Sequence, residues 1–196
     1  MGNKIRTEQK SMTHHYDIHI DADGRWFHEG GEIKREKLVA LFATVLSFEA
    51  DGESDGETDG ASGGQYWLRT PAEAGIITVA DAPFVIVDCA FVDDEGAELS
   101  DEALSETTNV KIIFIDNLQR RWPLGAAHRL VIRKGATSEE PRPYLTLEKG
   151  LTARLLRPVF YQLAERAYWD EDGKAWIRSG EHAFCLEATD ASDKVS

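Results

Sequence analysis

The sequence is poor in cysteine and has no long apolar segment. Cys89 and Cys185 are the only cysteines among 196 residues, and neither lies in a CxxC or Cys/His spacing. This argues against a disulfide framework, and we interpret both as buried thiols of a reducing compartment. No apolar run is long enough to cross a bilayer, and the N-terminus lacks the apolar segment of a signal peptide. We therefore expect a cytoplasmic protein without a membrane partner.

Common catalytic signatures are missing as well. The chain contains no P-loop, GxGxxG or cysteine-nucleophile context, no GxSxG elbow between a strand and a helix, and no HExxH or HxxxH pair in a predicted helix. This removes the usual fingerprints of NTPases, dinucleotide-binding enzymes, serine hydrolases and zinc proteases. We expect no cofactor and no metal, and we expect a binding protein in preference to an enzyme.

Acidic side chains dominate, but unevenly. The formal net charge is -13, and residues 1–98 carry 8 basic and 20 acidic side chains. Residues 105–168 reverse this balance, with 11 basic and 6 acidic side chains. The overall charge argues against nucleic acid or an anionic membrane as partner, whereas the local excess of basic residues favours an anionic small molecule.

Composition divides the chain into two lobes between flexible ends. We predict a flexible tail over residues 1–15, an N-terminal lobe over 16–98, a C-terminal lobe over 99–188 and a short tail over 189–196. Within the first lobe, residues 49–64 carry six acids and no base, which predicts a mobile acidic loop. Part of this loop resembles the start of an EF-hand, but Ser62 stands where the bidentate glutamate is needed, so calcium is not expected.

Hydrophobic periodicity in the first lobe predicts strands around one helix. Alternation from Tyr16 and an Asp23-Gly24 turn indicate a hairpin. Apolar residues at helical spacing indicate a helix from about Lys34 to Phe48. Three further strands are expected in the runs QYWLRT, GIITVAD and FVIVDCAF.

The second lobe shows a similar pattern. The runs TNVKIIFID, HRLVIR, PYLTLE and KAWIRSGEHAFCLE indicate strands. Lys149-Gly150 indicates a tight turn, and Pro158 fixes the start of a helix that we expect to end near Tyr168. Residues 67–70 and 176–179 repeat an aromatic-aliphatic-Arg-hydroxyl pattern. Either the lobes are a degenerate duplication, or they are two ordinary sheet-plus-helix units; in both cases the fold class is α+β.

The stretch GRWFHEGGEI places His28 beside Glu29 and Glu32. In a strand, neighbouring side chains point to opposite faces, so these three converge only if the turn brings them together. The readings are a catalytic or metal constellation, a pH-sensitive hydrogen bond between lobes, or a half-buried imidazole with ordinary partners.

Polar residues within apolar, turn-rich segments form the strongest candidate site. The candidate ligand-binding residues are Trp26, His28, Glu32, Arg69, Thr70, Glu73, Asn109, Arg142, Tyr144 and Arg154. Arginine suits this role because its planar fork matches phosphate and carboxylate. The alternative is internal: Arg69 or Arg154 forms a salt bridge with Glu73 or Glu32 that ties the lobes together.

The segments IDADGRWFHEGGEI, TPAEAGIITVADAPFVIVD, TTNV and PRPYLTLEKGLTARLLRPVFYQL resemble the bacterial domain-of-unknown-function family 1285 over Tyr16–Leu186. The resemblance implies a two-lobed, internally duplicated α+β fold whose C-terminal lobe is loosely like a pleckstrin-homology (PH) barrel. It also implies a ligand site between the lobes, for a nucleotide-like molecule, and a role in signalling.

Three hypotheses for function follow. The first is a non-catalytic sensor that holds an anionic, nucleotide-like molecule between the lobes: Arg69 and Arg142 pair with its charge, Tyr144 or Trp26 stacks on it, and Asn109 and Thr70 orient it. The second is a protein-interaction adaptor in which the Arg/Glu set is structural. The third is an enzyme on a phosphorylated metabolite, with His28 as general base.

Overall fold

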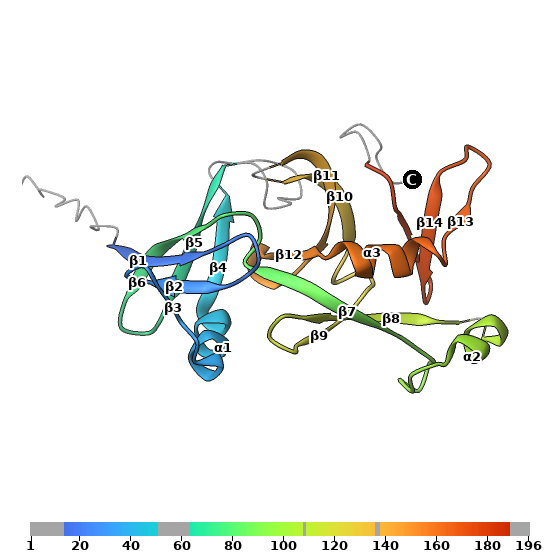
Figure 1. Ribbon diagram of the computed structural model, residues 1–196, viewed down its shortest axis with the longest axis horizontal. Helices are drawn as coiled ribbons and strands as arrows, with labels where there is room; N and C mark the ends of the chain where they lie inside the picture. Colours follow the sequence, from blue (N-terminus) through green and yellow to red (C-terminus); the bar gives the residue numbers. More distant parts are fainter. Residues whose placement is uncertain (1–13, 51–62, 108, 136–137, 189–196) are drawn as a thin grey trace, which may run out of the picture.

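The computed structural model describes residues 14–50, 63–107, 109–135 and 138–188, without the side chains of 134–139. The chain is a mixed α+β protein, mostly sheet, in which two six-stranded sheets form two lobes (Figure 1). This confirms the predicted fold class. No helix among these residues is long and apolar enough to span a membrane.

Sheet A builds the N-terminal lobe. Its strands are β1 (His14–Ile20), β2 (Trp26–His28), β3 (Gly31–Glu32), β4 (Leu46–Ala50), β5 (Gly64–Arg69) and β6 (Ala74–Val79). Their spatial order is β3-β2-β1-β6-β5-β4, and β1 and β6 are parallel. Helix α1 (Glu36–Val45) connects β3 to β4.

Sheet B builds most of the C-terminal lobe. Its strands are β7 (Phe84–Val92), β8 (Lys111–Asp116), β9 (Arg121–Pro123), β10 (Leu130–Gly135), β11 (Ser138–Thr146) and β12 (Thr152–Leu155). Their order is β10-β11-β12-β7-β8-β9, with β12 and β7 parallel. The sheet curls, so that β10 and β11 arch away from β7 and β8 (Figure 1).

Most of the remaining elements lie at the end of the molecule farther from sheet A (Figure 1). Helix α2 (Asp101–Glu106) separates β7 from β8, and helix α3 (Arg157–Ala164) follows β12. Strands β13 (Tyr168–Trp169), β14 (Ala175–Ser179) and β15 (His182–Cys185) form a third, antiparallel sheet. The short η1 turn (Glu148–Gly150) joins β11 to β12, with Lys149 and Gly150 at positive φ.

Four turns share one local design. Each begins with an aspartate, namely Asp21, Asp93, Asp116 or Asp170, whose carboxylate accepts the backbone N–H groups two and four residues later. The residue three positions after the aspartate has a positive φ and is Gly24, Gly96, Gln119 or Gly173. The predicted Asp23-Gly24 hairpin is confirmed, and the aspartate that closes it is Asp21.

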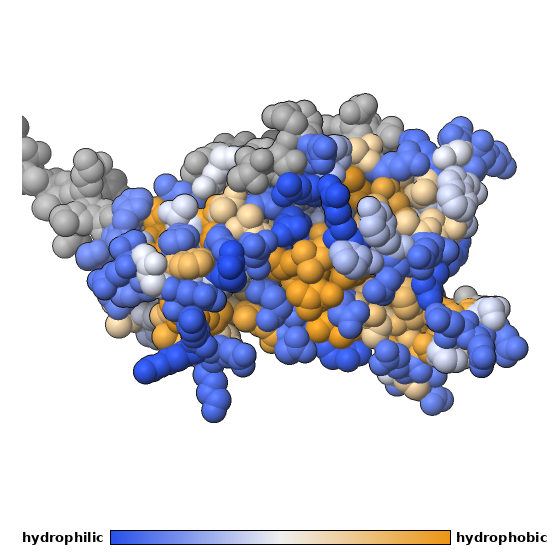
Figure 2. All heavy atoms as spheres, viewed as in Figure 1, coloured by the Kyte–Doolittle hydropathy of each residue, from blue (hydrophilic) through white to orange (hydrophobic). Residues whose placement is uncertain are grey.

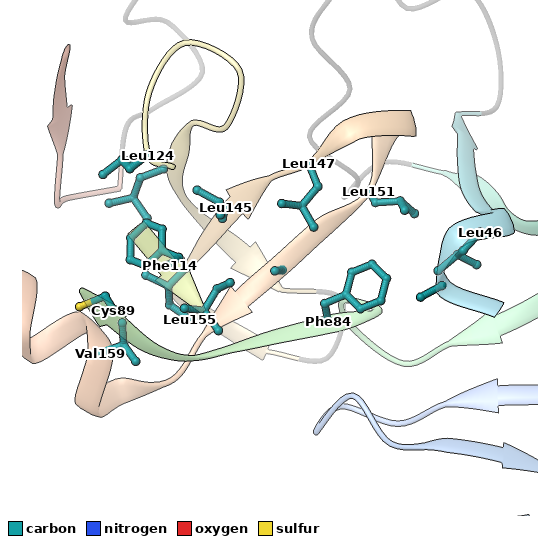
Figure 3. Packing of buried hydrophobic residues seen from close by; sticks show 14 of the residues in the cluster. Leu46, Phe84, Cys89, Phe114, Leu124, Leu145, Leu147, Leu151, Leu155 and Val159 are labelled. Atoms are coloured by element: carbon teal, nitrogen blue, oxygen red, sulfur yellow. The ribbon is translucent and has the colours of Figure 1, made fainter. Parts of the chain in front are cut away.

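One hydrophobic core joins both lobes. Buried residues of sheet A, such as Leu46, belong to the same cluster as Phe84, Phe114 and Leu155 of sheet B. Figure 3 shows this core running from Leu46 through Phe84 to Leu124. The lobes therefore share apolar surface, and their contact does not depend on polar groups alone.

Several predicted boundaries were wrong. The predicted helix over Lys34–Phe48 ends at Val45, because Leu46 turns to extended backbone and begins β4, which pairs with β5. The second predicted helix ends at Ala164, and Tyr168 begins β13.

The ends of the predicted loop and tail also differ. His14 and His15, assigned to the tail, lie in β1 because they pair with β6. Glu49, Ala50 and Gly64 of the predicted acidic loop lie in strands β4 and β5. The rest of that loop, with the EF-hand-like segment, lies outside the described residues.

The division between the lobes was placed at residue 98, whereas β7 pairs with β12 and β8 of sheet B. The residues assigned to the N-terminal lobe therefore supply the strands of sheet A and also strand β7 of sheet B. Duplication and likeness to a PH barrel stay predictions.

Both cysteines are free; Cys89 is buried as predicted, but Cys185 is partly exposed. Burial, with a contribution from Asp88, raises the pKa of Cys89 to about 11.

Candidate functional site

Three of the predicted residues meet around Asp81, which sequence analysis did not single out. The Tyr144 hydroxyl donates a 2.8 Å hydrogen bond to Asp81 Oδ1. Arg154 Nε lies 3.3 Å and Arg142 Nη1 lies 3.7 Å from Asp81 Oδ2. Asp81 follows β6 of the N-terminal lobe, whereas its three partners lie on β11 and β12 of the C-terminal lobe, so this cluster joins the lobes.

Arg154 makes a second connection between the lobes. Its Nη2 donates to the Ala22 carbonyl oxygen at 2.8 Å and lies 3.9 Å from Asp23 Oδ1. The internal ion pair considered from the sequence therefore exists for Arg154, with Asp81 and Asp23 in place of Glu73 and Glu32. The side chain of Asp81 is 1% exposed, so this group is a buried network and not an open pocket.

Two tyrosines of this region are held in the neutral form. Burial raises the pKa of Tyr144, and the hydrogen bond to Asp81 raises it further. Burial likewise raises the pKa of Tyr66 on β5 to about 12, although the positive charge of Arg133 opposes this. Both phenols are therefore protonated at neutral pH, and Tyr144 acts as a hydrogen-bond donor to the Asp81 carboxylate.

Arg69, Thr70 and Glu73 lie at the opposite end of sheet A. Glu73 precedes β6 and Asp81 follows it, and six residues of strand span roughly 20 Å. Arg69 pairs with Glu49 at 2.9 Å and donates to Ser47 Oγ at 3.0 Å. The Thr70 hydroxyl closes the β5–β6 turn by donating to the Glu73 carbonyl oxygen at 3.1 Å. Arg69 and Arg142 therefore do not face one ligand.

The other predicted residues are dispersed. Asn109 donates two hydrogen bonds to the carboxylate of Asp94, at 2.7 and 2.8 Å, near α2. His28 ends β2 and is exposed, and the turn after it has positive φ at Glu29 and Gly30. The stretch around His28 is thus a strand end and a turn. Among the residues that the structure describes, no group of three or more His, Cys, Asp or Glu side chains is placed to hold a metal ion.

A cavity of about 220 Å³ lies between α1 and the C-terminal lobe. Its lining combines two cations, two aromatic rings, one carboxylate and small or aliphatic groups. They are Ala43, Thr44, Phe84, Arg120, Trp122, Leu147, Glu148, Lys149 and Leu151. None of these residues was among the predicted site residues.

The guanidinium of Arg120 is fixed in this cavity. Arg120 Nε donates to Asp116 Oδ2 at 2.7 Å, and the guanidinium carbon lies 3.9 Å from the ring centre of Phe84 and 5.0 Å from that of Trp122. Trp122 Nε1 donates to the same carboxylate at 3.0 Å. The buried Asp116 therefore orients both the cation and one aromatic ring of the cavity.

Lys149 brings the second cation from the η1 turn. Its φ of 56° is unusual for a residue other than glycine. Its Nζ donates to the carbonyl oxygen of Thr44, in the last turn of α1, at 2.6 Å. This contact places an ammonium group at the negative end of the helix dipole and links the two lobes across the cavity.

The sequence contained a signal for Arg120 but none for Lys149. The segment IDNLQRRW has the same turn pattern as IDADGRW, with an aspartate, a basic residue four positions later and a tryptophan one or two positions after that. The contact of Lys149 with Thr44 depends on how the lobes pack, because 105 positions separate them.

Comparisons with known proteins found similarity to one family. Residues 83–186 match a family model described as "Protein of unknown function (DUF1285), C-terminal domain", and residues 8–54 match "Domain of unknown function (DUF1285), N-terminal domain". A DUF1285 family protein of known structure from Silicibacter pomeroyi DSS-3 is 28% identical with a TM-score of 0.66, covering 89% of this chain and 81% of that one. Another from Shewanella baltica OS155 is 22% identical with a TM-score of 0.49, covering 76% and 91%. No match was found among curated proteins.

Proposed function

Given that the chain belongs to the DUF1285 family, we propose that it is a non-catalytic sensor that holds an anionic small molecule between its two lobes. The observation that carries this proposal is the 220 Å³ cavity, whose lining includes Arg120 and Lys149 as well as Phe84 and Trp122. We place this function in the bacterial cytoplasm because both cysteines are free thiols.

The lining favours an anion with a planar part. Asp116 fixes the plane of the Arg120 guanidinium through Nε and Nη2, and the remaining N–H groups can donate to a phosphate or carboxylate. Trp122 offers an aromatic surface beside it. The volume is below the range of about 300–1,000 Å³ for drug-sized ligands. It therefore fits a compact anion, or either the base or the phosphate end of a nucleotide.

A signalling role follows from what the ligand would displace. Lys149 bridges the lobes through the Thr44 carbonyl. An anion in the cavity would compete for this ammonium group, so occupancy and the contact between α1 and the C-terminal lobe would be linked. A ligand that changes this balance transmits its presence to the surface of the protein.

A thermal-shift titration tests the proposal. The probes are AMP, GMP, cyclic di-GMP and glucose 6-phosphate. A ligand at a hundred times its dissociation constant adds about 2.7 kcal/mol, which raises the melting temperature by several degrees. Lys149→Asn should abolish the shift without unfolding the protein, because asparagine tolerates positive φ. Lys37→Gln, an equal loss of charge on the exposed face of α1, is the matched control. No shift with any probe, or a shift that Lys149→Asn leaves unchanged, would remove this assignment.

Exposed aromatic residues favour the adaptor as the second candidate. Tyr161 on α3 and Trp169 on β13 are 58% and 67% exposed, and Val87 on β7 is also exposed. Figure 2 shows apolar side chains gathered over β7, β12 and the start of α3. Patches of this kind mark protein-binding surfaces. A Trp169→Ser variant that retains every protein captured by the parent chain would count against the adaptor.

A further inference from the structure

A second cavity, of about 250 Å³, lies at the other end of α1. It is an open hollow bordered by the β2–β3 hairpin, the first turn of α1 and the β8–β9 turn. Its apolar walls are Trp26, Ile33, Val39 and Leu118, and its charged lining is Arg25, Glu32, Lys34 and Glu36. The cavity holding Lys149 shares none of these residues.

Hydrogen-bond donors around this cavity lack acceptors. Trp26 is 2% exposed, and its Nε1 has no hydrogen-bond partner. Helix α1 begins at Glu36 after Arg35, which provides no side-chain cap. The first N–H groups of a helix have no partner within the helix and carry partial positive charge. Lys34 makes no ion pair or hydrogen bond with any residue in the described part of the chain. The N–H groups at the start of α1 and the ammonium group of Lys34 favour a carboxylate.

Carboxylates at the same cavity favour a positive group as well. Glu32 and Glu36 form no ion pair with the described residues. Arg25 does not neutralise them, because its guanidinium is held by Asp21 at 2.8 Å and by Asp23 at 3.3 Å. A simple anion would meet two carboxylates here, and a simple cation would meet Lys34 and the positive end of α1. The lining is therefore matched to a molecule that carries both charges.

We propose that this cavity binds an apolar α-amino acid in its zwitterionic form. The carboxylate accepts hydrogen bonds from the start of α1 and pairs with Lys34. The ammonium group pairs with Glu32, and the side chain packs between Trp26, Val39 and Leu118. The cavity is smaller than a typical drug-sized site, which suits a single amino acid better than a peptide. Because it contacts both lobes, this site adds a second ligand to the proposed sensor and does not depend on the first.

The indole N–H signals in a ¹H–¹⁵N correlation spectrum give a direct test. The signal of Trp26 is identified by its loss in Trp26→Phe. Titration with L-leucine or L-phenylalanine should shift this signal to saturation. Two analogues of leucine, 4-methylpentanoate and 3-methylbutylamine, each lack one of its charges and should bind at least tenfold more weakly.

Substitutions inside and outside the cavity test which residues bind the amino acid. Lys34→Gln and Glu32→Gln should each weaken leucine binding by about threefold to tenfold, as expected for partly exposed charge pairs. Lys37→Gln and Lys149→Asn should leave it unchanged. The proposal is overturned if neither amino acid shifts the Trp26 signal, if the two analogues bind as well as leucine, or if Lys34→Gln behaves as Lys37→Gln does.

Discussion

Asp81 is the buried centre of one of the polar contacts between the lobes. Its buried carboxylate accepts from Tyr144 and lies within 4 Å of two arginines. Tyr144→Phe removes one buried hydrogen bond and should lower the free energy of unfolding by about 1–2 kcal/mol. Asp81→Ala should lower it by about 3 kcal/mol or more, because Arg154, 14% exposed, then loses the partner of a buried charge. Urea unfolding measures both values.

Arg69→Ala is the internal comparison for this prediction. Arg69 and its partner Glu49 are 38% and 58% exposed, so the pair should contribute no more than about 1 kcal/mol. If Asp81→Ala destabilised the protein no more than Arg69→Ala does, the Asp81 network would not stabilise the contact between the lobes.

At the scale of elements, the aspartate turns share one hydrogen-bond pattern but differ in what else the aspartate contacts. Asp93 and Asp116 both close turns with two backbone hydrogen bonds, but Asp116 is buried and also holds Arg120 and Trp122. Asp93→Ala should cost about 1 kcal/mol of stability. Asp116→Ala should cost about 3 kcal/mol or more and should weaken the ligand-induced thermal shift, because Arg120 then loses its fixed plane. Equal effects of both substitutions on stability and on the shift would contradict this account.

Elements set by local chemistry could be predicted from the sequence, and elements set by pairing could not. The Asp23-Gly24 hairpin and the Pro158 helix start depend on neighbours in the chain, and both were found. Leu46 follows α1 with the same apolar spacing as the helix, so only its pairing with Leu68 of β5 shows that it belongs to a strand.

The same distinction applies to the candidate site. Arg142, Tyr144 and Arg154 were singled out because they are polar residues in an apolar setting. Their common partner Asp81 is 63 positions from Tyr144, and only the order of the strands brings them together. Arg69 carried the same local signal but lies at the far end of β6, since sequence spacing does not show which end of a sheet a turn occupies.

At the scale of the molecule, the two sheets are joined at several points around a shared core. The polar links are Tyr144 to Asp81, Arg154 to Ala22, Asn117 to Gly24 and Lys149 to Thr44. The proposed cavities lie beside these links, one at each end of α1. A ligand in either proposed cavity would therefore act on the contact between the lobes directly, without a relay through the core.

The buried tyrosines beside this contact make the stability of the whole molecule sensitive to alkaline pH. The pKa of Tyr66 is raised from 10.0 to about 12 in the folded protein, and that of Tyr144 is also raised. A neutral tyrosine with a raised pKa stabilises the fold fully below about pH 10, and this contribution is lost as the pH rises from 10 toward 12, because the unfolded chain releases its proton first.

We expect the free energy of unfolding, measured with urea at a series of pH values, to fall through this interval. Tyr66→Phe should make the free energy of unfolding fall less steeply with pH. Tyr161→Phe, at an exposed position on α3, should leave this pH dependence as it is in the parent protein. If the Tyr66→Phe and parent curves run parallel from pH 10 to 12, ionisation of Tyr66 is not coupled to folding.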